Sequence, residues 1–207
     1  MKRKKNKSLS SLFDKRDVVT DKIFGYVESD IQELLEKDNS VLAERSYFNV
    51  DMGKLIENVS KKYDINPVFL AIVLMAKADH LKYIDRDPSV EDVSKSLDMH
   101  AITNPAMLME SFARLIIKTK KNIYASNNLK VSVSDCKNKF QVKNKPTAVL
   151  YKILPWIGNK NHKVYKRKVD EEGNIIKVWK VTEKTEPFGV KLFWMMAHGL
   201  GYKDIVK

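Results

Sequence analysis

The sequence predicts a mainly α protein: a compact helical domain followed by a C-terminal basic α+β module that contains a β-hairpin. Two observations indicate this fold class. Apolar residues recur at steps of three and four over much of the first 124 residues, as they do in amphipathic helices. Residues 163–169 and 175–181 are rich in β-branched and aromatic residues and flank a turn that contains Gly173, which is typical of a hairpin.

Length and composition allow one domain, or one domain with an appendage. The 207 residues are 43% hydrophobic and include seven Gly and six Pro, so we expect regular structure to dominate. We expect a flexible basic arm at residues 1–17, a helical domain at 18–124, and a basic module with the hairpin and a C-terminal helix at 125–207.

Capping residues mark the first helices of the helical domain. Thr20-Asp21 offers an N-cap for an amphipathic helix that runs to about Asp38. Asp51 caps a second helix, which we expect to end near Asp64.

The central core helix is predicted to begin at Asn66-Pro67, a cap followed by a first-turn proline. The run that follows is apolar around its whole circumference up to Ala78, so we expect it to be buried on every side. Residues 85–88 are expected to interrupt the helical structure before the next cap.

Two further helices complete the predicted domain. Ser89 and Asp92 form the start of a short helix to about Leu97, and Asn104-Pro105 opens a longer one to about Ile123. Five apolar side chains of the longer helix are expected to face inward: Met107, Leu108, Phe112, Leu115 and Ile116.

The C-terminal part of the chain has a weaker pattern. Residues 125–145 predict loop with some strand, and residues 147–154 form a short apolar segment before the hairpin. Residues 190–198 predict a last apolar helix.

The cysteine and histidine content limits the chemistry and the compartment. Cys136 is the single cysteine, which excludes an intrachain disulfide and a Cys-rich zinc site and favours a reducing compartment. The four histidines have no metal-binding spacing, so we expect neither a metal nor another cofactor.

No targeting or membrane segment is expected. The basic N-terminus lacks the apolar run of a signal peptide, and no apolar stretch reaches the roughly 20 residues that a bilayer demands. We expect a cytoplasmic, intracellular protein without a membrane partner.

The net charge of +12 is divided unevenly along the chain. Residues 1–16 hold seven Lys or Arg and one Asp, whereas residues 17–113 hold ten basic and eighteen acidic side chains. Residues 114–168 hold fifteen basic side chains against Asp135, and the remainder is balanced at six against six. The segment 114–168 therefore carries a charge of +14, more than the whole protein.

So many like charges repel one another, and an anionic partner relieves that repulsion. Nucleic acid, either DNA or RNA, is the commonest such partner, and the scarcity of Asp and Glu in the segment favours it over the solvated face of a Lys-rich chain. The predicted nucleic-acid-binding residues are Lys118, Lys120, Lys121, Lys137, Lys139, Lys143, Lys145, Lys163, Tyr165, Lys166, Arg167, Lys168 and Trp179.

The predicted hairpin combines cations with aromatic rings. Its cations can contact phosphates, while Tyr165 and Trp179 can stack on bases or pack over sugars. The alternative is that the rings anchor the hairpin to the core.

Residues 90–104 have the cadence of a helix-turn-helix, a unit that would place the start of its second helix in a major groove. The alternative is an ordinary pair of packed helices, because the turn lacks Gly and the second helix starts without a cation.

Residues 61–77, from Lys61-Lys-Tyr-Asp to Leu-Met-Ala-Lys77, resemble the helix that enters the active site of lytic transglycosylases. That family places Glu followed by Ser in the next turn, where the Glu protonates the glycosidic oxygen, and this sequence has Lys77-Ala78 there. The resemblance therefore implies a degenerate domain that lacks the catalytic Glu.

No sequence motif indicates catalysis. Asp85 and Asp87 could hold a divalent ion but fall in a predicted solvated loop. We therefore expect a non-enzymatic nucleic-acid-binding accessory protein of transcription, replication or packaging that binds mainly through phosphate contacts. The alternatives are a structural or assembly protein that binds other subunits through complementary charged and apolar faces, and the degenerate lytic-transglycosylase-like domain.

Overall fold

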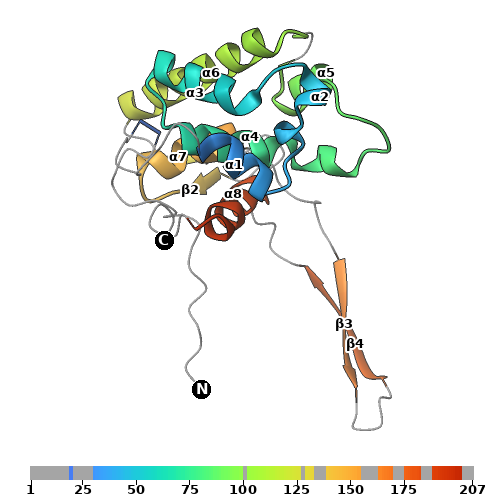
Figure 1. The fold of residues 1–207 in the computed structure, drawn as a ribbon. Helices are drawn as coiled ribbons and strands as arrows, with labels where there is room; N and C mark the ends of the chain where they lie inside the picture. Colours follow the sequence, from blue (N-terminus) through green and yellow to red (C-terminus); the bar gives the residue numbers. More distant parts are fainter. Residues whose placement is uncertain are drawn as a thin grey trace.

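The computed structural model describes residues 19–20, 30–99, 102–126, 129–132, 139–154, 163–169, 175–182 and 188–201, with the backbone alone for the strand residues and Phe188. Helices dominate, so the described part of the protein is mainly helical (Figure 1).

The helices follow one another closely along the chain. In chain order they are α1 (Asp30–Lys37), the 3₁₀ helix η2 (Val41–Ala43), α2 (Arg45–Phe48), α3 (Met52–Tyr63), α4 (Pro67–Ala78), the 3₁₀ helix η3 (Asp79–Tyr83), α5 (Val90–Ser96), α6 (Pro105–Ala125), α7 (Lys145–Ile153) and α8 (Phe188–Gly199). The predicted helices that correspond to α3 to α6 and α8 are confirmed, whereas η2, α2, η3 and α7 were not expected. Residues 21–29 of the first predicted helix lie outside the described residues.

The core helix α4 lies at the centre of the fold (Figure 1). The Asn66 Oδ1 atom accepts a hydrogen bond from the Phe69 backbone N–H at 3.0 Å, and Pro67 stands in the first turn, where no intrahelical donor is needed. Every residue from Val68 to Ala78 is buried, because α1, α3, α5 and α8 surround the helix. The predicted burial of this helix on every side is confirmed.

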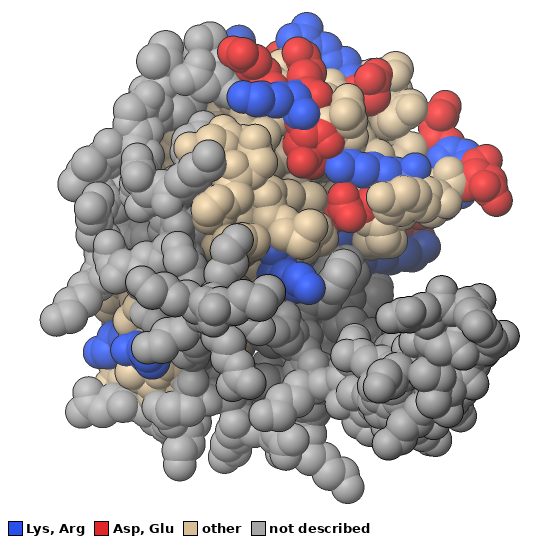
Figure 2. Space-filling model, turned by 90° about the horizontal axis from the view of Figure 1, so that it is seen from below, with Lys and Arg blue, Asp and Glu red and all other residues tan. Residues whose placement is uncertain are grey.

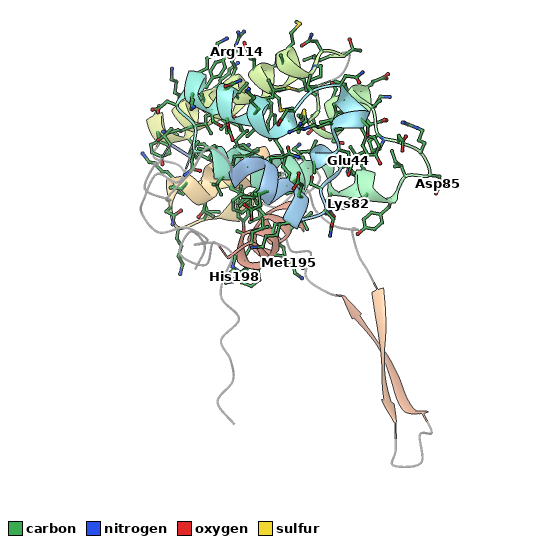
Figure 3. The ribbon with its side chains drawn as sticks, in the orientation of Figure 1. Glu44, Lys82, Asp85, Arg114, Met195 and His198 are labelled. Atoms are coloured by element: carbon green, nitrogen blue, oxygen red, sulfur yellow. The ribbon has the colours of Figure 1, made fainter. Side chains whose placement is uncertain are left out.

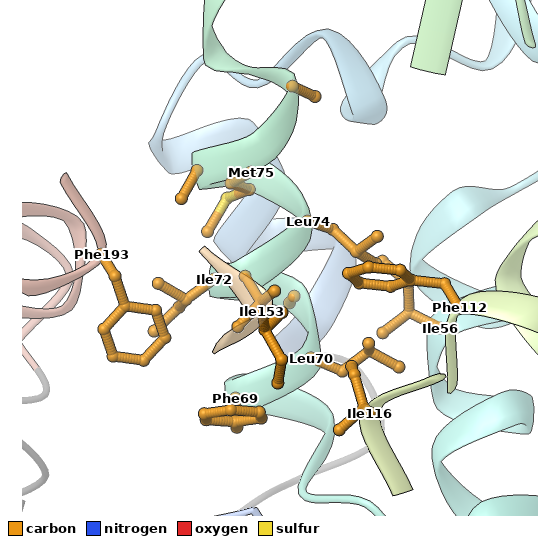
Figure 4. Close-up of a cluster of buried hydrophobic side chains, with 14 of the residues drawn as sticks. Ile56, Phe69, Leu70, Ile72, Leu74, Met75, Phe112, Ile116, Ile153 and Phe193 are labelled. Carbon is orange, nitrogen blue, oxygen red and sulfur yellow. The ribbon is translucent and has the colours of Figure 1, made fainter. Parts of the chain in front are cut away.

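Helices from both sides of residue 124 pack on α4. The ring of Phe193 in α8 lies 5.7 Å from the ring of Phe69, measured between centroids, while Phe112 and Ile116 of α6 lie against the opposite side (Figure 4). Ile153 of α7 belongs to the same cluster. Burying one such side chain contributes about 1.5–3 kcal/mol to folding. The division into a helical domain and a basic module stays a prediction, but the two segments contribute to one hydrophobic core.

The inward face of α6 differs from the predicted one at two positions. Leu108, Phe112 and Ile116 are buried as expected, but Met107 is 63% exposed and Leu115 is 41% exposed. Because a helix turns by about 100° per residue, Leu115 lies at the edge of the face that these residues define and Met107 lies opposite its centre. The prediction that Met107 and Leu115 point inward was wrong.

The connection between α5 and α6 is too long for a helix-turn-helix. Residues 97–99 and 102–104 are not helical, and α6 begins only at Pro105, after its cap Asn104. The motif joins its helices by three to four residues. The helix-turn-helix interpretation was therefore wrong.

The strands form two antiparallel pairs. β1 (Lys130–Ser132) pairs with β2 (Lys139–Gln141), and β3 (Lys163–Val169) pairs with β4 (Ile175–Thr182). Figure 1 shows β3 and β4 standing apart from the helices. Because no side chain of β3 or β4 is described, the β-hairpin and its surface stay a prediction.

Candidate nucleic-acid interface

The predicted binding residues with described side chains lie where α6 ends and α7 begins. Lys118, Lys120 and Lys121 occupy the last two turns of α6, Lys143 lies just before α7, and Lys145 is the first residue of α7. We call these five residues the α6–α7 patch.

The other predicted residues fall into two groups. Lys137 lies outside the described residues, and the rest have a described backbone only. The latter are Lys139 in β2, Lys163, Tyr165, Lys166, Arg167 and Lys168 in β3, and Trp179 in β4. Their part in binding stays a prediction.

Tyr124 connects the two helices of the patch. The Lys145 ammonium donates a hydrogen bond to the Tyr124 carbonyl oxygen at 2.8 Å, which ties the start of α7 to the end of α6. The Nζ atoms of Lys120 and Lys145 each lie 5.6 Å from the centre of the Tyr124 ring, a range at which a cation is attracted to an aromatic ring. This attraction offsets part of the repulsion between the two cations and allows them to share one place.

The start of α7 adds to the positive potential of the patch. The Asn144 Oδ1 atom caps the helix by accepting a hydrogen bond from the Thr147 N–H at 3.0 Å, and the first turn contains no acidic residue. A helix N-terminus carries a partial charge of roughly +0.5, which Lys145 increases where an acidic residue would cancel it. An anion is therefore favoured near this turn.

The described ion pairs lie outside the patch, among residues 38–114. They are Arg45–Asp51, Lys62–Glu110, Lys77–Asp98, Lys82 with Asp38 and with Asp79, Arg86–Asp92, Lys95–Glu91 and Arg114–Glu110. By contrast Lys118, Lys121 and Lys143 are exposed, and none of the three forms an ion pair with a described residue.

Arg114 is the first cation of the basic segment 114–168, and side chains of α3 and α6 neutralise its charge. Its Nη2 atom lies 3.4 Å from Glu110 Oε2, and its Nε donates to the Tyr63 hydroxyl at 2.8 Å. Glu110 also accepts hydrogen bonds from Lys62 Nζ at 2.7 Å and from the Tyr63 hydroxyl at 3.1 Å, and these two bonds lower the pKa of the Glu110 carboxyl. Within about one turn of α6 the chain thus passes from a paired cation to Lys118, which forms no ion pair with a described residue.

Basic and acidic side chains alternate on the described surface of residues 30–114. Figure 2 views the molecule from below and shows basic and acidic side chains side by side over one part of this face. Neighbouring charges of opposite sign cancel at a distance, so such a surface attracts a polyanion less than a surface of one sign does.

Lys77 stands where the resemblance to lytic transglycosylases would place an acid. Its side chain is 8% exposed, and its Nζ lies 2.6 Å from the Asp98 carboxylate, which is 73% exposed. An ion-paired ammonium does not supply the carboxylic acid that glycosidic cleavage requires.

The described residues offer neither a metal cluster nor a membrane-spanning helix. They contain no group of three or more His, Cys, Asp or Glu side chains that could hold a metal ion. They also contain no helix that combines the length and the apolar character needed to cross a bilayer.

Comparison with known proteins adds no family to these observations. Neither a protein-family model, nor a curated protein, nor a solved structure matches this chain. Function is therefore inferred from the charge and geometry of the patch.

Two residues of this region were missed by the sequence analysis. Tyr124 follows Lys120 by four residues, so its place beside that lysine on the helix was a detectable signal. Thr20 accepts a hydrogen bond from the Lys120 ammonium at 2.8 Å across one hundred residues of sequence, and no local pattern indicates that contact.

Proposed function

We propose that this protein is a non-catalytic nucleic-acid-binding accessory protein of transcription, replication or packaging, which binds mainly through phosphate contacts. The observation that carries the proposal is the exposure of Lys118, Lys121 and Lys143 without an ion pair to any described residue, while the described ion pairs occupy cations only up to Arg114. Cations left without internal partners retain their attraction for an external polyanion.

The binding mode follows from the chemistry of lysine. Each ammonium is a flexible point charge that can replace a counterion at a phosphate, but it lacks the planar fork that reads a guanine edge. Sequence preference is therefore expected to be modest.

The hairpin of β3 and β4 is proposed to extend the surface. The Cα partner of Tyr165 in the backbone pairing is Lys180, and that of Lys166 is Trp179, so each of these two pairs combines an aromatic and a basic residue. This arrangement suits phosphate contacts combined with stacking on bases.

A salt titration of binding to DNA and RNA tests the patch. The Lys118→Gln/Lys121→Gln variant is expected to lower the slope of log affinity against log salt by about 1.8 on duplex DNA, because each phosphate contact contributes about 0.9. The matched control is Lys37→Gln/Lys54→Gln, which removes the same charge from exposed positions of α1 and α3 and leaves the slope unchanged. Equal slopes for both variants and the unmodified chain would remove the patch from the interface.

The hairpin is tested in the same titration. Changing Lys166, Arg167 and Lys168 to Glu is expected to abolish binding while thermal unfolding of the helical body stays unchanged. Binding at the original affinity in this variant excludes the hairpin and leaves the patch as the proposed contact.

One observation favours the assembly alternative. A hollow of about 420 Å³ lies between the end of α1, η3 and α8, and Met195, at its lining, is 53% exposed. Met195 and Lys82 are labelled in Figure 3. The Lys82 ammonium forms ion pairs with Asp38 at 3.0 Å and with Asp79 at 3.1 Å. An apolar hollow with a charged rim suits a contact with another subunit. An assembly protein of this kind would show no steep salt dependence with DNA or RNA.

A further inference from the structure

The last three turns of α6, residues 115–125, contain no acidic residue. Lys118, Lys121, Asn122 and Ala125 are exposed there, and we call these four residues the α6 end face. Because a helix turns by about 100° per residue, Asn122 lies about 40° to one side of Lys118, and Lys121 lies about 60° to the other. Two cations and one amide therefore point away from the core on one side of the helix.

Contacts behind the α6 end face hold this part of the helix in place. Ile116 is fully buried in the core. The Lys120 ammonium donates a hydrogen bond to Thr20 Oγ1 at 2.8 Å, and the Tyr124 carbonyl oxygen is bonded to the start of α7. Figure 1 shows α6 and α8 at opposite edges of the helical body. The α6 end face therefore belongs to a packed helix at an edge of the molecule.

Asn122 differs in chemistry from the lysines beside it. Its side-chain amide is exposed and forms no hydrogen bond with a described residue. A carboxamide offers an N–H donor and an oxygen acceptor side by side, which matches N7 and the N6 amino group of adenine in the major groove. Asn122 therefore has the chemistry of a base contact, whereas the two lysines supply attraction to phosphates.

The dimensions of α6 suit the same groove. A helix with its side chains is about 10–12 Å across, and the major groove of B-form DNA is about 12 Å wide. The major groove of an RNA duplex is too deep and narrow for side chains to reach its bases. The first half of α6 is less suitable, because residues 105–113 contain no cation and include Glu110.

We propose that residues 115–125 of α6 lie in the major groove of duplex DNA, where Asn122 contacts an adenine and the charges of Lys118 and Lys121 hold the helix on the DNA. The inference rests on the proposed function and deepens it, because it names duplex DNA as the partner and one residue that determines specificity. One base contact agrees with the modest sequence preference expected of a surface rich in lysine.

A protein partner is the competing occupant of this side of α6. Met107 and Leu115 are exposed on it, and apolar side chains suit a protein contact. DNA is favoured because Lys118 and Lys121 form no ion pair with a described residue, and because an exposed Leu115 also suits contact with a thymine methyl group.

The first experiment measures base preference with the full chain. The unmodified chain and Asn122→Ala each select sites from a library of random duplex DNA. We expect the unmodified chain to enrich adenine at one position, and Asn122→Ala to lose this enrichment. The slope of log affinity against log salt is expected to stay unchanged in Asn122→Ala, because no charge is removed.

The matched control is Asn58→Ala, which removes an exposed amide from α3 and is expected to keep the enrichment. Absence of adenine enrichment by the unmodified chain, or equal enrichment by Asn122→Ala, would overturn the inference and leave this side of α6 to a protein partner.

The second experiment locates the contact in the groove. The selected adenine is replaced by 7-deazaadenine, which lacks the N7 acceptor and leaves the phosphates in place. We expect the unmodified chain to bind this duplex about tenfold more weakly, and Asn122→Ala to bind both duplexes equally. An RNA duplex of the selected sequence is expected to bind more weakly than the DNA. Equal affinity of the unmodified chain for all three duplexes contradicts a major-groove contact.

The two proposals fail in different ways. If the unmodified chain binds neither DNA nor RNA with a steep salt dependence, the proposed function is wrong and the inference with it. If it binds with a steep salt dependence but prefers no base, the inference alone is wrong.

Discussion

Lys77 carries a buried ammonium at the last turn of the core helix α4. Its one described partner is Asp98, whose backbone has a left-handed φ of 58°. The carboxylate is mostly exposed, so water screens the pair, but the ammonium itself has left bulk water. The two side chains therefore differ in what their removal costs.

We predict opposite effects for the two halves of this pair. Asp98→Asn keeps a residue type that tolerates the left-handed backbone and leaves the ammonium without its counter-charge, so we expect a loss of about 1–3 kcal/mol in the free energy of unfolding. Lys77→Met removes the buried charge at similar volume and is expected to be neutral or stabilising. Urea unfolding measures both, and the double variant is expected to match Lys77→Met. A larger loss for Lys77→Met than for Asp98→Asn would show that the ammonium has another role.

At the scale of elements, the crossing of α1 and α3 depends on a residue without a side chain. A Cβ atom at Gly53 would lie 2.9 Å from the Cα and N atoms of Gln32 in α1. Backbone atoms cannot rotate away as a flexible side chain can, so any larger residue at position 53 must push the two helices apart.

Gly53→Ala is therefore predicted to destabilise the fold by about 1–3 kcal/mol, the usual range for overpacking. The expected destabilisation is opposite in sign to the normal effect of alanine inside a helix, which stabilises the fold by roughly 0.5–1 kcal/mol relative to glycine. Gly199→Ala at the end of α8 is the matched control, because no atom lies within 4 Å of its added Cβ. Equal thermal unfolding temperatures for the two variants would contradict the close crossing.

The starts of these elements were readable from local sequence. Asp51, Asn66, Ser89 and Asn104 each accept the backbone hydrogen bond that their position predicts. Their signal is local, because a cap bonds to a backbone N–H two or three residues away. The orientation of α6 was harder to predict from the sequence. Met107 is an apolar residue of a type common in protein cores, and its exposure depends on neighbours that lie far away in sequence.

At the scale of the whole molecule, two carboxylates make the stability of the fold depend on pH. Hydrogen bonds from Lys62 and then Tyr63 lower the pKa of Glu110, which joins α6 to α3. The Arg86 guanidinium holds the pKa of Asp92 well below its usual range through two hydrogen bonds of 2.7 Å. A carboxyl with a lowered pKa stabilises the fold above its unfolded pKa of about 4, and this contribution is lost as pH falls.

The free energy of unfolding is therefore predicted to fall between about pH 5 and pH 3. Glu110→Gln and Asp92→Asn are each expected to be less stable than the unmodified chain at pH 7 and to lose less stability on acidification. Urea unfolding at pH 7, 5, 4 and 3 measures the difference. Curves that stay parallel across this range would show that these carboxyls do not govern acid sensitivity.

The candidate site was predictable in part at this scale. Charge counting along the chain located the basic segment, because charge is a property of composition and needs no fold. Counting could not separate Arg114, which Glu110 neutralises, from Lys118, which has no described ion-pair partner, since that distinction depends on which side chains the packing of α3 and α6 brings together.

The sequence by itself determined the helical class, the starts of α3 to α6 and the uneven distribution of charge, because each depends on residue types and on neighbours within a few positions. Only the tertiary structure decided which cations are already paired, which side of α6 is buried, and that Thr20 meets Lys120. Those facts depend on contacts between residues tens of positions apart, and such contacts form only when the apolar surfaces of the helices pack around α4.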